Sequence, residues 1–289
     1  MSLTEIILIA ALGLGAGLAG GLAGIGGSII TLPGLHVVLT RAQAHPELHH
    51  TFMAAAMTAA LFVATPSALS HYRAGAVRTP YLKRLITGTV LGVVAGVLLS
   101  NAAPVGVLKF LLGCVILWYA LRTLARVVRP RRRAFTGEGR VEHASTPKLV
   151  VIGLVVGLFS GLLGIGGGVI LVPLLQIVCN VKLRNAIATS SAVVCFTVTT
   201  GATVKLLSLH ALGQSPAEAL SIALVLIPTA MIGGWVGAKL THALPLVAVR
   251  SALVVLFLAT VARMAGLWGQ PPEIPDTDAP PAHVALPND

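Results

Sequence analysis

Eight long apolar segments constrain this chain more than any other feature. They occupy residues 3–39, 48–70, 80–100, 104–128, 148–179, 185–208, 218–240 and 245–268. Each approaches or exceeds the roughly 20 apolar residues that a membrane-spanning helix needs. Only 10% of the 289 residues are charged, against about 25% in soluble domains, which argues against a soluble enzyme. The sequence therefore predicts an all-α polytopic membrane protein.

The net charge of +11 does not indicate a nucleic-acid-binding protein. Binding of nucleic acid requires a basic face on a soluble domain, whereas here the charges lie between apolar runs. The run Arg131–Arg133 is typical of a topology determinant in contact with anionic lipid. We expect the lipid bilayer as a partner and no nucleic acid.

An internal repeat organises the apolar segments. Residues 17–33 and 157–173 match at an offset of 140, with ten of seventeen positions identical. Gly92, Gly96 and Pro104 align with later residues at an offset of 141. We infer a duplicated four-segment unit with a first membrane repeat (1–128), a basic cytoplasmic linker (129–147), a second membrane repeat (148–268) and a disordered, acidic, Pro-rich tail (269–289).

The distribution of basic residues favours inverted rather than parallel repeats. The junction after the second segment holds four Lys and Arg residues and the linker region eight, which places both in the cytoplasm. An inverted second half then puts four basic residues inside, against two for a parallel one. Inversion needs an odd number of crossings in each repeat. A broken, re-entrant first segment satisfies this, and one long kinked helix is the alternative.

Two glycine clusters, one in each repeat, are the strongest candidates for a binding site. Glycine destabilises a helix by about 1 kcal/mol relative to alanine, so each cluster predicts a break. The helix that restarts after a break presents free N–H groups and its positive dipole end to an anion. The candidate residues are Gly24, Gly26, Gly27, Ser28 and Thr31 in the first repeat and Gly164, Gly166, Gly167 and Gly168 in the second. Close helix packing is the alternative, and we prefer it for Gly13, Gly17 and Gly21 and for Gly88, Gly92 and Gly96.

Hydroxyl side chains at the start of the sixth segment are further candidates. Thr189, Ser190 and Ser191 could line a polar path. The alternative is that each bonds the carbonyl one turn earlier in its own helix. The corresponding stretch of the first half, 50–56, has diverged.

Carboxylates are absent from the apolar segments between Glu47 and Glu138 and between Glu142 and Glu218. Proton- and cation-coupled transporters usually keep an intramembrane carboxylate, whereas an anion path would avoid one. We expect no catalytic residues, no cofactor and no metal site. Lys205 is a minor candidate for a pore mouth, and we place His49 and His50 in a loop.

The sequences GLAGIGGSIITLPGL and GLLGIGGGVILVPLL resemble those of the sulfite exporter TauE/SafE family, as do AIATSS and HYRAGAVR. The resemblance extends from about residue 5 to residue 268, and it departs from the family pattern at Ala54–Ala56, where Thr-Ser is usual. It implies secondary transport of small sulfur anions, such as sulfite or sulfoacetate, across the bacterial inner membrane.

The resulting hypothesis is a multi-pass transporter, an exporter, of small anions that works by alternating access between the repeats. An anion channel and a non-transporting membrane assembly subunit are the alternatives. We expect a small anionic substrate and allow for a homodimer.

Overall fold

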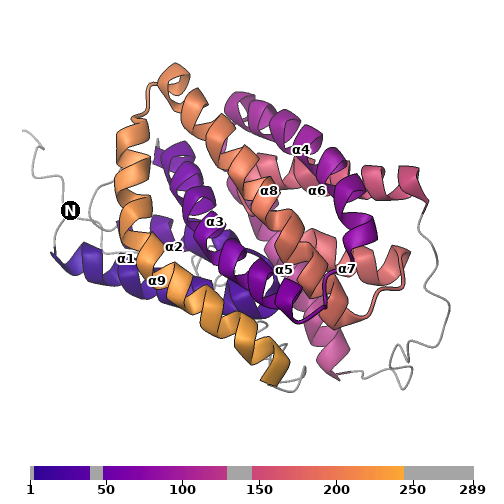
Figure 1. Cartoon of the computed structure of the whole chain (residues 1–289). Helices are drawn as coiled ribbons and strands as arrows, with labels where there is room; N and C mark the ends of the chain where they lie inside the picture. The colour runs from indigo at the N-terminus through magenta and orange to yellow at the C-terminus, as the bar shows by residue number, and fades with distance from the viewer. Residues whose placement is uncertain (1–2, 40–47, 129–144, 244–289) are drawn as a thin grey trace, which may run out of the picture.

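The computed structural model describes residues 3–39, 48–128 and 145–243 (Figure 1). These residues form helices and no strand. The elements are α1 (Leu3–Ala23), α2 (Ser28–Leu39), α3 (His49–Arg73), α4 (Thr79–Ala102), α5 (Val105–Val128), α6 (Thr146–Leu163), α7 (Gly168–Val178), α8 (Leu183–Leu209), the short 3-10 helix η2 (His210–Leu212) and α9 (Pro216–Ala243). Within the described ranges, six helices are long and apolar enough to cross a membrane. The all-α prediction is confirmed for this part of the chain.

The first and fifth apolar segments are each broken into two helices that fold back on one another. A Cβ at Gly27 would lie 2.8 Å from the carbonyl oxygen of Ala16, and one at Gly34 would collide with Leu12, so α2 returns along α1. In the second hairpin, a Cβ at Gly167 would lie 2.8 Å from Val156. The structure therefore has helical hairpins here, not single kinked helices.

Helices α3 and α8 pack together and run in opposite directions (Figure 1). His50 at the start of α3 contacts Lys205 near the end of α8. At the other end of the pair, Ser67 of α3 lies 3.3 Å from Ser191 of α8. The most extensive contacts join α4 to α6 and α1 to α9, and α3 also packs against α9 and α4 against α8.

Glycine brings the paired helices backbone to backbone. On α4, a Cβ at Gly88, Gly92 or Gly96 would collide with the carbonyl oxygen of Val150, Leu154 or Leu158 on α6. A Cβ at the packed glycines of α6 would likewise collide with the backbone of α4. A Cβ at Gly17 or Gly21 of α1 would collide with the backbone of α9. Because these contacts advance along both chains together, each pair is parallel. The packing role predicted for these glycines is confirmed.

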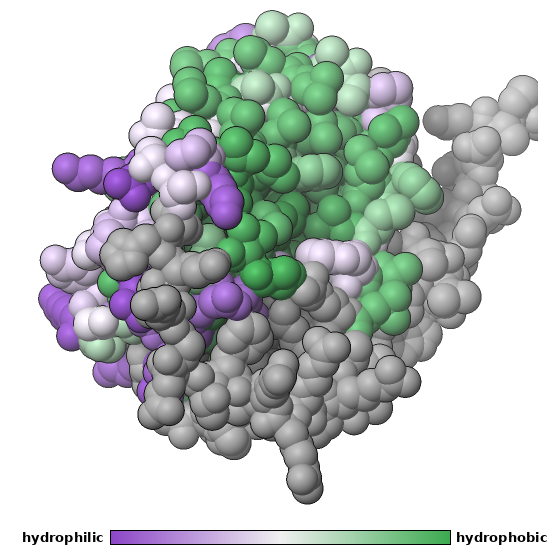
Figure 2. Space-filling model, turned by 90° about the vertical axis from the view of Figure 1, so that its right-hand side faces the viewer, coloured by the Kyte–Doolittle hydropathy of each residue, from purple (hydrophilic) through white to green (hydrophobic). Residues whose placement is uncertain are grey.

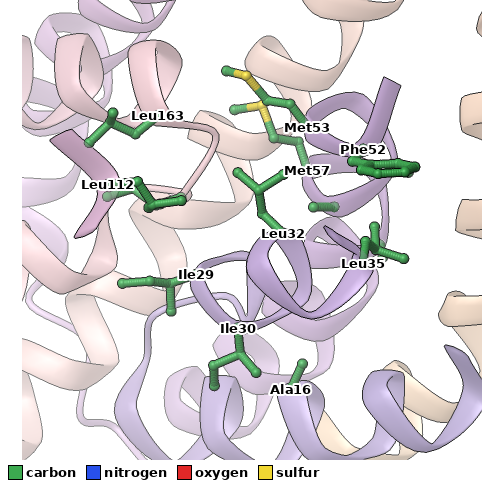
Figure 3. Packing of buried hydrophobic residues seen from close by; sticks show 14 of the residues in the cluster. Ala16, Ile29, Ile30, Leu32, Leu35, Phe52, Met53, Met57, Leu112 and Leu163 are labelled. Carbon is green, nitrogen blue, oxygen red and sulfur yellow. The ribbon is translucent and has the colours of Figure 1, made fainter. Parts of the chain in front are cut away.

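The second helix of the first hairpin contributes to the buried apolar core (Figure 3). Leu32 and Leu35 of α2 point towards Met57 and Phe52 of α3, and all four side chains are at most 2% exposed. Burial of each such side chain stabilises the fold by about 1.5–3 kcal/mol in water. Between elements surrounded by lipid, the same contacts act through van der Waals packing.

Large apolar side chains also cover the outside of the molecule, as Figure 2 shows for one face. Leu91 and Leu98 on α4 are 61% and 57% exposed, and Val151 on α6 is 56% exposed. An apolar surface of this extent is typical of a protein surrounded by lipid.

Basic residues gather at one end of the helix bundle. The turn from α3 to α4 carries Arg73 and Arg78, and the backbone N–H of Arg78 donates to Thr189 near the start of α8. The start of α6 joins the same end, since Leu149 shares an apolar cluster with Tyr81 and Val181. The basic residues at this end are Arg73, Arg78, Lys83, Arg84, Lys148, Lys182 and Arg184.

Several predicted parts of the chain lie outside the described residues. They are the eighth apolar segment (245–268), nearly all of the linker (129–147) and the tail (269–289).

The backbone contact between α4 and α6 predicts a specific sensitivity to methyl groups. Gly92→Ala should destabilise the protein by about 1–3 kcal/mol, because overpacking forces the helices apart. Gly106→Ala on α5 is the matched control, since a Cβ there would meet nothing within 4 Å. Thermal unfolding of the purified variants in detergent checks this. Equal melting temperatures for the two variants would contradict the assigned contact.

Candidate functional site

Left-handed glycines form both helix breaks. The φ angles are +67°, +80° and +81° at Gly24, Gly26 and Gly27, and +69°, +71° and +78° at Gly164, Gly166 and Gly167. Residues other than glycine rarely adopt this backbone conformation. The two breaks therefore share one backbone path, and the glycines at these positions are required by conformation.

Each break leaves backbone donors at the start of a new helix. The first bonds described for α2 run from the N–H groups of Ile30 and Thr31 to the carbonyl oxygen of Gly27. In α7, Ile170 and Leu171 donate to Gly167 in the same way. The N–H groups before them have no partner within the helix, as at any helix N-terminus. Together with the helix dipole, these groups favour a negative charge.

The two breaks lie directly against each other. A Cβ at Gly168 would lie 2.5 Å from the carbonyl oxygen of Gly24, and one at Gly166 would lie 3.3 Å from Ser28 Oγ. Near the middle of α8, Val194 and Val198 pack against Gly26 and Gly166 respectively. The breaks therefore meet halfway along α8, where an anion between them would face two helix N-termini.

Ser28 adds a hydroxyl group to this meeting point. Its side chain is 0% exposed, and its Oγ has no hydrogen-bond partner among the described residues. An unsatisfied buried hydroxyl typically costs about 1–3 kcal/mol, so such a group calls for an explanation, and a bound ion is one. Thr31 instead donates to the carbonyl oxygen of Gly27, at 3.2 Å.

The three predicted hydroxyls of α8 have different surroundings. Ser190 Oγ donates to the carbonyl oxygen of Gly24 at 3.0 Å, which ties α8 to the first break. Ser191 Oγ donates to its own helix, at Ile187, as the alternative prediction stated. Thr189 Oγ1 accepts the N–H of Arg78 at 3.0 Å, at the basic end of the bundle. The structure thus brings Ser190 to the glycines and directs Thr189 to the start of α4.

A buried polar cluster at the other end of the bundle was largely missed by sequence reasoning. Lys205 is 0% exposed and contacts His50, Ser100 and Asn101. The placement of His49 and His50 in a loop is wrong, because both are buried in the first turn of α3. A single lysine within an apolar segment was the available signal.

Comparison with known proteins finds relatives that are named probable membrane transporters. It is 30% identical to the probable membrane transporter protein MamO of Paramagnetospirillum magneticum, over 91% of this chain and 44% of that protein. The MamO of Magnetospirillum gryphiswaldense gives the same identity. This chain thus spans less than half the length of these two relatives.

A shorter relative is covered almost completely. The probable membrane transporter protein YunE of Bacillus subtilis is 26% identical over 82% of this chain and 89% of its own length. No solved structure gives a significant match. The model of the family described as sulfite exporter TauE/SafE matches residues 9–264. The chain therefore belongs to the sulfite exporter TauE/SafE family.

Proposed function

We propose that this protein transports a small anion that binds between the two glycine breaks. The observation that carries the proposal is the meeting of two helix N-termini beside the unpartnered, buried hydroxyl of Ser28. Backbone N–H groups around Gly26–Gly27 and Gly166–Gly167 would hold the anion, Ser28 would add a hydroxyl donor, and Ser190 would fix the first break through its bond to the carbonyl oxygen of Gly24. The absence of carboxylates from the described interior agrees with this charge preference.

The substrate class that we propose is a small sulfur-containing oxyanion or organosulfonate, such as sulfite or sulfoacetate. The family description names sulfite export, and the relatives are named probable membrane transporters. A tetrahedral or trigonal oxyanion suits two converging sets of N–H donors. We propose export across the bacterial inner membrane as the direction and location.

Alternating access between inverted repeats is the mechanism we infer. The antiparallel contact of α3 with α8 supports inversion, since these helices follow corresponding hairpins in the two halves. The gathering of basic residues at one end supports it as well. Because the breaks are in contact, an anion can enter only when the halves move apart, and movement of one half against the other would provide this.

Removal of the Ser28 hydroxyl should weaken anion binding without destabilising the protein. Ser28→Ala loses a donor to a charged ligand, which corresponds to about 1.5–3 kcal/mol, or at least about tenfold in affinity. The melting temperature should be unchanged or higher, because this hydroxyl has no partner to lose.

Calorimetry with sulfite, sulfoacetate, thiosulfate, sulfate and small carboxylates measures this affinity. Ser221→Ala, at an exposed position of α9, is the matched control. If no anion of this panel bound the unmodified protein, the proposed function would be wrong. An anion that bound both variants equally would exclude Ser28 from the site.

Two exposed glycines test the inversion. Gly75 in the turn between α3 and α4 and Gly213 in the turn between α8 and α9 both have φ above +60° and no neighbour within 4 Å of a Cβ. In a background without the native cysteines, Gly75→Cys and Gly213→Cys are treated with a membrane-impermeant maleimide on intact cells. Inverted repeats predict labelling of Gly213→Cys alone. Parallel repeats would place both positions on the same side of the membrane. Both would then be labelled on intact cells, or neither would be labelled until the cells are lysed.

A further inference from the structure

The most unusual ionisable group in the described part of the chain is Lys205, on α8. Its ammonium contacts Asn101 Oδ1 at 2.6 Å, His50 Nδ1 at 2.8 Å and Ser100 Oγ at 3.2 Å. An ammonium has three N–H donors, and these three neutral acceptors occupy them all. The ammonium of Lys205 therefore has no donor left for direct contact with an anion. The geometry indicates instead that the Lys205 side chain is a site that binds a proton.

The charge of this ammonium is not balanced by any described carboxylate. Helix α4 contributes only the neutral side chains of Ser100 and Asn101, and Glu218 of α9 is exposed. The titratable groups at this end are His36 of α2, His49 and His50 of α3 and Lys109 of α5. Burial of an unpaired charge costs several kcal/mol. The protonated state of Lys205 therefore requires compensation from another source.

A chain of contacts connects Lys205 to the second glycine break. Ser100 Oγ lies 3.6 Å from Met53 Sδ, and a Cβ at Gly164 would lie 2.5 Å from Met53 Cγ. Met53 thus links the shell of Lys205 to the second glycine break. At low dielectric, an anion there would stabilise the ammonium.

Histidines connect Lys205 to the outside of the molecule. His50 and His49 are in ring contact, with centroids 5.7 Å apart, and His49 Nδ1 lies 2.9 Å from His36 Nε2. His36 is partly exposed. Hydrogen bonds thus join His36 to His49 and His50 to Lys205, and these two pairs meet through the ring contact of His49 with His50.

We propose that Lys205 takes up a proton when an anion binds at the glycine breaks. This inference rests on the proposed function and adds the ion linked to it. Because linkage is reciprocal, protonation of Lys205 would raise the affinity for the anion by the same factor as the anion raises the affinity for the proton.

The test measures proton uptake by the purified full chain in weakly buffered detergent solution. A pH-sensitive dye reports protons while calorimetry reports binding of thiosulfate, sulfate or sulfoacetate. The unmodified protein should take up as much as one proton for each bound anion. Lys205→Met should take up none, and neither should Lys205→Arg, which stays charged. Lys83→Met, at the exposed basic end, is the control and should behave as the unmodified protein.

Asn101→Asp covers the case in which the Lys205 variants do not fold. It is nearly isosteric and places a carboxylate beside the ammonium, so that Lys205 remains protonated and proton uptake is lost. Binding without proton uptake by the unmodified protein, or uptake that persists in Lys205→Met, would overturn this inference and leave the proposed function intact. Binding of no anion would overturn both.

Discussion

Contact between helix backbones, permitted by glycine, is the interaction on which this structure depends. In lipid, apolar side chains gain little by leaving their surroundings, so helices associate through van der Waals contact and hydrogen bonds. The parallel pairs α4–α6 and α1–α9 achieve this through glycines spaced four residues apart, such as Gly88, Gly92 and Gly96. Each pair joins the first helix of one hairpin to a helix from the other half of the chain, so the two halves are in contact along both pairs.

This packing determines where the broken helices end. Because α1 and α6 are held at their outer surfaces, the turns after them meet beside α8, and α2 and α7 start from this point. Irregular backbone at membrane depth is tolerated only within protein or beside a water-filled cavity. Here it lies within protein, against Val194 and Val198. The packing glycines hold the helices together, and the glycines of the two breaks leave the helix N-termini next to each other.

Sequence reasoning succeeds where the signal is local and fails where it depends on distant partners. The breaks at Gly24–Gly27 and Gly164–Gly167 follow from glycine's own conformational preference. The role of Thr189 depends on the start of α4 lying beside it, which no local pattern encodes. Lys205 resembles an ordinary mouth residue until the fold brings His50 and Asn101, which are 155 and 104 residues away in sequence, to its ammonium.

The location of a bound anion would show whether the two glycine breaks form the binding site. Selenate is a heavy analogue of sulfate, and its anomalous scattering in crystals of the protein would mark its position without reference to any variant. We expect one principal site between Gly26–Ser28 and Gly166–Gly168, within hydrogen-bond distance of Ser28 Oγ. Selenate bound only at the basic end of the bundle, with none between the two breaks, would contradict it.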